Sequence, residues 1–313
     1  MKRYNRWMRC GIFVVLVFIS TANSDNRKTA SPVQMAEVDS SVQHKISKRY
    51  SPVLYFSEGE DFFPIEVKSY LDHSQLMERI PFFLKDRVVS DSVTPAVLER
   101  NSSKDYYLRL RKENCTGIAS YYQKIRKTYS RTIYSKLFEV KNSPEISFVL
   151  YYWFFFWGSK AGSVNFTWHQ CDWEMFMLYL NRDYEPIYIG LSQHYYGSVK
   201  NWEDINREEC HPVIYVARGS HGLYLSPGKH KAYYDKNKKW RLGSDICEAA
   251  LHWSPGNYQI VVLNDSLGWL NFKGYWGTLT TTRLPGPKFR HPKDPSLTMW
   301  RNPLGWFEKY RVP

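Results

Sequence analysis

The sequence predicts a mainly β protein, specifically an antiparallel β-sandwich with short peripheral helices. From residue 130 onward, apolar runs of strand length alternate with short turn segments. Hairpins that recur about every 8–15 residues favour an antiparallel sandwich over a parallel α/β sheet. Aromatic residues make up 17% of the chain, and large rings pack better on a sheet than on a helix.

The first 24 residues predict a cleavable secretory signal. Four basic residues lie within the first nine positions, the apolar run Cys10–Ser20 follows, and Ala22–Ser24 supplies small residues for a signal peptidase. A membrane-spanning helix needs roughly 20 apolar residues, so this run is short for an uncleaved signal-anchor, which is the alternative. We expect a secretory-pathway protein that is secreted or lies in the lumen of the vacuole or another endomembrane compartment.

The charge balance favours an anionic partner. Without residues 1–24 the chain has 289 residues, with 39 Lys and Arg against 30 Asp and Glu, and a net charge of +9. A positive surface attracts anionic lipid head groups and acidic glycans. The sequence has no arginine-rich arm, zinc finger or RNA-binding signature. We therefore expect a membrane surface or a glycan head group as partner, and no nucleic acid.

Cysteines and glycosylation sequons agree with an oxidising compartment. Four cysteines remain after the signal, which allows two disulfides in any of three connectivities. Four Asn-x-Ser/Thr sequons predict a glycoprotein. The cysteines are Cys115, Cys171, Cys210 and Cys247, and the sequons begin at Asn101, Asn114, Asn165 and Asn264.

The mature chain begins with a polar stretch. Residues 25–49 are rich in Ser, Lys, Asp and Gln, and we expect them to be a flexible N-terminus. Residues 50–313 are expected to form a single β-sandwich domain. It opens with a strand at Tyr50–Phe56, followed by short helices within residues 74–84 and 94–110.

Three pairs of apolar runs follow, each separated by a turn segment, and each is expected to form a hairpin. A further apolar run, Pro212–Ala217, ends in a glycine-bounded loop. The tail from Leu284 is rich in Pro, Gly and Trp and is expected to be irregular. The three pairs are Thr132–Val140 with Ile146–Trp157, Met175–Leu180 with Pro186–Leu191, and Tyr258–Leu263 with Trp269–Trp276.

The segment Trp168–Glu174 (WHQCDWE) concentrates charge just before a strand. Alternate side chains of an extended chain share a face, so Asp172 and Glu174 are expected to point the same way, with His169 on the preceding loop. Two crowded carboxylates raise each other's pKa unless a cation relieves them. Oxygen-rich sites with one imidazole suit Ca²⁺, Mg²⁺ or Mn²⁺. We therefore take His169, Asp172 and Glu174 as candidate ligands of a divalent cation.

Other polar residues at strand ends are candidates for ligand binding. His194 follows one apolar strand, and Ser220 and His221 follow another. Loop residues held by a rigid sheet are typical functional positions. The alternative is that the acids form a solvated strand edge and the histidines are ordinary hydrogen-bonded loop residues. Ser220 does not lie in a Gly-x-Ser-x-Gly motif, so the sequence does not favour a serine hydrolase.

Several motifs resemble the vacuolar protein sorting-associated protein 62 family. The matching segments occur in the family's order over about residues 50–306, and HPVIYVARGSH is the most specific. The resemblance implies a shared fold, and the family name implies a connection with vacuolar sorting. The segments are Tyr50–Phe56, Tyr152–Phe156, His169–Glu174, Ser192–His194, His211–Gly222, Gly274–Gly277 and Pro285–Pro287.

A more distant resemblance is to the necrosis- and ethylene-inducing toxin family, whose heptapeptide GHRHDWE is similar to Trp168–Glu174. It implies a secreted β-sandwich that binds a divalent cation and attacks membranes after recognising sphingolipid head groups. The positions that match are His169, Asp172 and Glu174. Gln170 and Cys171 depart from the heptapeptide.

Three interpretations follow for the function. The first is a non-catalytic binding protein whose polar His/Asp/Glu pocket, with or without a divalent cation, recognises an anionic or glycan head group at a membrane surface. The second is a metal-assisted hydrolase of a phosphodiester or glycosidic bond, with His194 or His221 as acid and base. The third is a structural cluster that ties loops together. We rank binding first because the sequence supplies no nucleophile and no substrate.

Overall fold

The computed structural model describes most of the chain beyond the N-terminal segment. The predicted signal peptide and the sequon residues Asn114 and Asn165 lie outside the described residues. Within the described part, no helix combines the length and the hydropathy needed to cross a bilayer. The described residues are 35–80, 85–111, 115–141, 143–160, 168–194, 196–235, 240–277, 284–289, 300 and 302–311.

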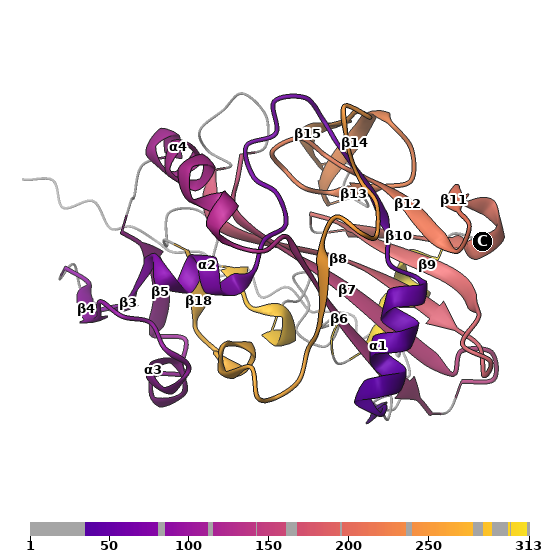
Figure 1. Ribbon diagram of the computed structural model, residues 1–313, viewed down its shortest axis with the longest axis horizontal. Coiled ribbons are helices and arrows are strands. Elements are labelled where there is room, and N and C mark those ends of the chain that lie inside the picture. The colour runs from indigo at the N-terminus through magenta and orange to yellow at the C-terminus, as the bar shows by residue number, and fades with distance from the viewer. Residues whose placement is uncertain are drawn as a thin grey trace, which may run out of the picture. The chain divides into compact units, whose positions relative to one another are not determined.

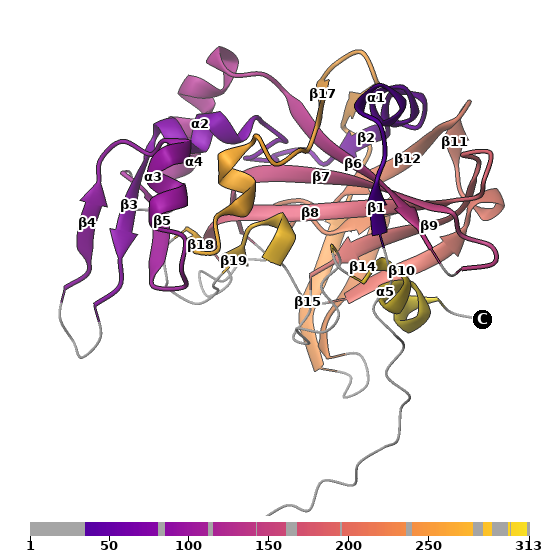
Figure 2. The same cartoon turned by 90° about the horizontal axis from the view of Figure 1, so that it is seen from below.

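The largest sheet has seven strands in the order β1-β6-β7-β8-β9-β10, with β17 also paired to β6 (Figure 1 and, for β1 and β17, Figure 2). All neighbours are antiparallel except β17, which runs parallel to β6. The strands are β1 (Met35–Glu37), β6 (Thr132–Val140), β7 (Phe148–Ser159), β8 (His169–Leu180), β9 (Pro186–Gln193), β10 (Tyr196–Asn201) and β17 (Gln259–Val262).

Both faces of the β7–β8 pair are buried, which explains its nearly continuous apolar sequence. One face carries Phe156 and Asp172, which are directly opposite each other. On the other face, Trp173 contacts Trp269 and Trp276, with ring centroids 5.6 Å apart in each case. We call these three side chains the tryptophan cluster. Trp269 and Trp276 are close in sequence, whereas Trp173 lies about 100 residues before them.

A second sheet has the order β11-β12-β2-β16, and β13 also pairs with β12. Strands β2 and β12 are parallel, although about 160 residues separate them in sequence. A separate hairpin, β14–β15, lies near this sheet (Figure 2). The strands are β2 (Val53–Phe56), β11 (Arg207–Glu208), β12 (His211–Val216), β13 (Leu223–Tyr224), β14 (Gly228–Asp235), β15 (Trp240–Cys247) and β16 (Leu251–Trp253).

A third sheet, β19-β18-β5-β3-β4, and several short helices complete the described elements. The strands are β3 (Ser74–Glu78), β4 (Arg87–Ser90), β5 (Tyr106–Leu110), β18 (Tyr275–Trp276) and β19 (Leu284–Pro285). The helices are α1 (Ser40–Arg49), α2 (Val67–Asp72), α3 (Pro95–Arg100), α4 (Cys115–Ile125) and α5 (Pro303–Tyr310), with 3-10 turns η1 (Arg126–Thr128), η3 (Trp202–Asp204), η4 (Gly268–Asn271) and η5 (Pro287–Phe289).

The predicted fold class is confirmed, because the described chain is mainly β with short helices. Two of the three predicted hairpins form, as β6–β7 and β8–β9. The third does not form. Its first run is β17, which pairs in parallel with β6, and its second run divides into η4 and β18, which pairs with β5. Packing of Trp269 and Trp276 in the tryptophan cluster overrides the local hairpin pattern.

The N-terminal part differs from the expectation of flexibility over residues 35–49, which form β1 and α1. The Asp39 carboxylate accepts the Ser41 backbone N–H at 2.9 Å and so caps the helix. The buried Gln43 side chain accepts the Leu137 N–H of β6 at 3.2 Å. A polar composition therefore concealed a helix that is capped by Asp39 and fixed to the sheet by a buried amide.

Two predicted helical ranges contain strands. Residues 74–78 form β3 and residues 106–110 form β5, which pair in one sheet. Among the residues of these two ranges that the structure describes, only α3, within the second range, is helical. It begins where expected, with the Thr94 hydroxyl accepting the Val97 N–H at 3.3 Å and Pro95 in the first turn.

The cysteines do not form the two disulfides that the sequence allowed. Cys210 and Cys247 are both free thiols. Every arrangement with two disulfides among the four cysteines would use both of them. Burial raises the pKa of the Cys247 thiol, the largest effect, and Asp245 raises it further.

Candidate functional site

A network of buried acids and histidines lies where strands β2, β8, β9 and β12 end or begin, against β15. We call it the buried charge network. It combines four carboxylates with two imidazoles, and hydroxyl groups bond to two of the carboxylates. Its charged or titratable members are Glu60, Asp172, Glu174, His194, His221 and Asp245.

His221 lies at the centre of this network and is fully buried. Its Nδ1 is 3.0 Å from Asp172 Oδ2, and its Nε2 is 3.4 Å from Glu60 Oε1. The imidazole also stacks on Phe156, with ring centroids 3.8 Å apart and an interplanar angle of 2°. Burial alone would lower the pKa of His221, but Glu60 and Asp172 outweigh it and raise the pKa to about 9. His221 is therefore a cation at neutral pH.

The second half of the network is centred on Asp245. This carboxylate lies 2.9 Å from His194 Nε2 and accepts the hydroxyls of Ser220 and Tyr224, each at 2.7 Å. Burial would raise the pKa of Asp245, but these partners bring it below its usual value. Burial would likewise lower the pKa of His194, yet the bond to Asp245 raises it. Each partner therefore favours the ionised form of the other.

Unusual backbone conformations occur at three of these positions. Cys171, His194 and His221 have φ angles of 61°, 59° and 59°, a region that non-glycine residues rarely adopt. The turn that carries His221 is closed by a hydrogen bond in which the His221 backbone N–H donates to the Ala217 carbonyl oxygen at 2.9 Å. Such conformations persist where surrounding contacts over-determine them, and they concentrate at functional sites.

The predicted cation ligands are only partly brought together. Asp172 and Glu174 share a face of β8, as expected, and Glu174 accepts the hydroxyl of Ser192. His169, however, directs its Nδ1 to the Cys171 carbonyl oxygen at 2.8 Å. Over the described residues, no three His, Cys, Asp or Glu side chains converge in a way that could hold a metal ion. The arrangement therefore does not present a ready-made ion site.

A cavity of about 370 Å³ lies beside the network, and we call it the network pocket. Two exposed cations, Lys160 and Arg218, line it together with Asp61 and the buried Asp245. The pocket therefore combines hydrogen-bond donors and acceptors of both charges. Its full lining is Gly59, Asp61, Lys160, Arg218, Gly219, Ser244, Asp245 and Ile246.

Gly219 connects the pocket wall to the network. Its N–H donates to Glu60 Oε2 at 2.7 Å, and its carbonyl accepts the Lys160 N–H at 2.6 Å. Its φ is +69°, and a Cβ at this position would lie 2.4 Å from the Lys160 carbonyl oxygen. Only glycine permits this close approach of the two chain segments.

Sequence reasoning found most of the network but missed two of its carboxylates. The structure brings together five of the predicted site residues: Asp172, Glu174, His194, Ser220 and His221. It leaves His169 bonded to its own strand. Glu60 and Asp245 were missed because each lies in a segment without a distinctive motif. The one available signal was that each acid is close in sequence to a glycine, Gly59 or Gly243.

Comparison with known proteins finds a curated relative that agrees with the first sequence resemblance. Vacuolar protein sorting-associated protein 62 of Saccharomyces cerevisiae (strain S288c) is 27% identical over 198 residues, which cover 50% of this chain and 40% of the yeast protein. The chain thus spans less than half the length of this relative. No model of a known protein family matches the chain.

Solved structures of the toxin fold are also similar, at low identity. Necrosis and ethylene inducing protein 2, from the causal agent of cocoa's witches' broom disease, is 14% identical, with 58% of this chain and 67% of that chain covered and a TM-score of 0.31. NLPPya in complex with glucosamine is 13% identical, with coverages of 62% and 72% and a TM-score of 0.33. A structure described as a toxin fold for microbial attack and plant defense is 11% identical, with coverages of 74% and 78% and a TM-score of 0.35.

Proposed function

We propose that this chain, which resembles vacuolar protein sorting-associated protein 62, is a non-catalytic binding protein of the secretory pathway. Its ligand is an anionic or glycan head group at a membrane surface, held in the network pocket. The observation that carries the proposal is Asp245. It is a buried carboxylate that lines the pocket and is fixed by three side chains behind it.

The pocket's chemistry suits a hydroxyl-rich ligand. A sugar hydroxyl both donates and accepts, and the pocket presents carboxylates that accept and a guanidinium and an ammonium group that donate. Bonds that involve a charged partner are the stronger ones, contributing about 1.5–3 kcal/mol. Lys160 and Arg218 are exposed and can bind an acidic substituent of the sugar. Asp61 is also exposed and can bind an amino substituent.

Binding is favoured over catalysis by the ionisation of His221. A general base must be neutral near its working pH. With a pKa of about 9, held up by Glu60 and Asp172, His221 is protonated at neutral pH. His194 is also shifted upward, through Asp245. His221 therefore does not suit the base role that the hydrolase interpretation assigns to it.

The test uses two sugars of opposite charge, glucosamine and glucuronate, measured by calorimetry or saturation-transfer NMR. We expect Asp61→Asn to weaken glucosamine binding about tenfold and Arg218→Gln to weaken glucuronate binding about tenfold, because each removes one charged contact. Arg182→Gln, in the exposed β8–β9 turn, is the matched control and should change neither affinity. Saturable binding of neither sugar would contradict the proposal.

The divalent cation is a separate part of the proposal. With both imidazoles protonated, four ionised carboxylates would leave the network with an excess of two negative charges, which a divalent ion would balance. Elemental analysis of the purified protein should then give one Ca²⁺, Mg²⁺ or Mn²⁺ per chain, lost on Asp172→Asn. A folded, metal-free protein that still binds the sugars would remove the cation and retain the binding function.

A further inference from the structure

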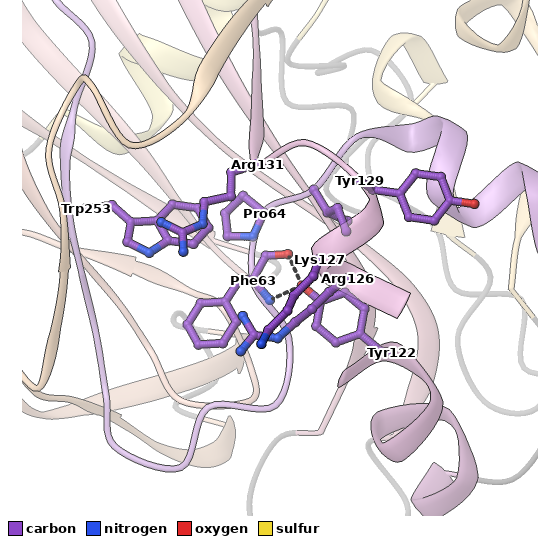
Figure 3. Close-up of a pocket in the computed structure, with 9 residues that line it drawn as sticks. Phe63, Pro64, Tyr122, Arg126, Lys127, Tyr129, Arg131 and Trp253 are labelled. Carbon is purple, nitrogen blue, oxygen red and sulfur yellow. Dashed lines mark hydrogen bonds between the residues drawn. The ribbon is translucent and has the colours of Figure 1, made fainter. Parts of the chain in front are cut away.

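A second pocket, on a different part of the molecule, combines aromatic rings with three cations. It lies where the turn η1 after α4 meets β16 and the segment after β2, and Figure 3 shows its lining side chains. Its volume is about 250 Å³. We call it the arginine–aromatic pocket, and it shares no residue with the network pocket. It is lined by Phe63, Pro64, Ile65, Tyr122, Arg126, Lys127, Tyr129, Arg131 and Trp253.

Its guanidinium groups are oriented by aromatic rings. Arg131 Cζ lies 4.7 Å from the centroid of the Trp253 ring, and Arg126 Cζ lies 5.4 Å from that of Phe63. The two rings stack on each other, with centroids 5.7 Å apart. An arginine on an aromatic face keeps the N–H groups at its edge available to a ligand. Both stacked rings are buried. The pocket therefore offers a ligand its positive charges rather than an aromatic face, and it selects the ligand by charge.

The aromatic base of the pocket is rigid. Trp253 and Tyr122 are almost fully buried. The Tyr122 hydroxyl bonds to both the backbone N–H and the carbonyl oxygen of Phe63, each at 3.0 Å (Figure 3). Tyr129 points away from the pocket, and its hydroxyl donates to Asp72 at 3.0 Å. The hydroxyls are thus already engaged, and the cations supply the ligand contacts.

The three cations have no anionic partner in the described part of the protein. None of the ion pairs formed there includes Arg126, Lys127 or Arg131. Arg126 Nε is buried and has no hydrogen-bond partner among the described residues. Glu66, next to the pocket's Ile65, accepts the Ser130 backbone N–H at 2.9 Å instead. Three crowded like charges with an unused donor favour a bound anion.

We propose that the arginine–aromatic pocket binds a phosphate group, held by Arg126, Lys127 and Arg131. A phosphate offers several acceptor oxygens to two guanidinium forks and one ammonium group. The small volume limits the ligand to a phosphate monoester with a compact substituent. Two sources share this chemistry, a phosphorylated head group on a lipid surface and a free phosphate ester.

The test compares three probes at low ionic strength: inorganic phosphate, glycerol 3-phosphate, and phosphatidylcholine vesicles with or without phosphatidic acid. The test variant is Arg126→Gln/Arg131→Gln. The control, Lys45→Gln/Lys124→Gln, likewise removes two cations, but these are exposed and lie outside the pocket. We expect the wild type and the control to bind at least one phosphate-bearing probe, and the test variant to bind about tenfold or more weakly. Arg131→Lys, which keeps the charge but loses the fork, should fall between them.

The probes also identify the source. Binding of glycerol 3-phosphate in solution points to a free phosphate ester, whereas binding only to vesicles with phosphatidic acid points to a lipid head group. Thermal unfolding checks that the test variant is folded. Equal binding by the test variant and the control, or no saturable binding by the wild type, would overturn the proposal. Because Asp61 and Arg218 lie outside this pocket, failure here and failure of the network pocket are measured separately.

Discussion

At the scale of single residues, His221 shows how a buried charge is maintained. It has lost all contact with water, which disfavours the protonated ring. Two carboxylates on its two nitrogens more than reverse this effect and raise its pKa to about 9. The stacked ring of Phe156 adds a face on which a cation is favourable. The ionised His221 therefore contributes to folding as well as to the site.

This gives a prediction for stability against pH. The pKa of His221 rises from about 6.5 in the unfolded chain to about 9 when folded. Its contribution is fully present below pH 6.5 and is lost as the pH rises through 9; its upper limit is about 3 kcal/mol. Chemical denaturation of the wild type from pH 6.5 to 9 should show a falling free energy of unfolding. His221→Gln should flatten that slope.

The matched control is His252→Gln, because His252 is exposed on β16 and should leave the slope unchanged. His194 adds a slope of the same sign through Asp245, so a residual slope in His221→Gln is expected. If that variant does not fold, the His221 ring can be titrated by NMR in the wild type. A ring that loses its proton near pH 6.5 would show that the two carboxylates do not hold the charge.

At the scale of elements, helix α5 packs on the large sheet through the rings of Trp306, Phe307 and Tyr310. Trp306 is fully buried and lies over Gly190 of β9 and Gly197 of β10. A Cβ on Gly190 would meet Trp306 Cζ3 at 2.6 Å. Glycines in strand interiors usually mark a close approach by another element. Here the missing side chains create the space into which the indole packs.

A double-mutant cycle tests this attachment. Trp306→Ala should cost about 3–5 kcal/mol of unfolding free energy through the cavity it leaves. Gly190→Ala should cost about 1–3 kcal/mol by overpacking in the wild type, but under about 1 kcal/mol in the Trp306→Ala background. Gly256→Ala, where the added Cβ meets open space, serves as the neutral control. Additive costs in the cycle would show that the two side chains do not compete for one space.

The elements also show what a sequence can predict. Hairpins β6–β7 and β8–β9 followed from local pattern, because the two strands of a hairpin are adjacent in sequence. The parallel pairs β2–β12 and β6–β17 could not be predicted in this way, since residues far apart in sequence determine them. The same limit applies to the site. Asp172 was visible beside Glu174, whereas Glu60 and Asp245 reach the network only through folding.

At the scale of the whole molecule, stability rests on packing of one large aromatic core. The free thiols of Cys210 and Cys247 exclude every arrangement with two disulfides that the sequence allowed. The core instead includes a row of fully buried rings along β7 and β8. A chain of this length can bury enough apolar surface to fold without covalent cross-links.

Thermal unfolding with and without dithiothreitol tests this conclusion. A native disulfide typically contributes about 2–5 kcal/mol, which for a domain of this size corresponds to several degrees in melting temperature. We expect the reductant to leave the melting temperature unchanged within the error of the measurement. A drop of several degrees would mean that a cross-link contributes to the fold.

The tryptophan cluster makes the packing of the core detectable by near-ultraviolet circular dichroism. Trp173, Trp269 and Trp276 come from β8, η4 and β18, and their rings lie within 6.0 Å of one another. Indoles held this close and at fixed angles couple their electronic transitions, so the folded chain should give an intense near-ultraviolet circular dichroism band. That band exists only while the C-terminal segments are docked on the sheet. Its loss ahead of the far-ultraviolet signal would reveal undocking before the strands themselves melt.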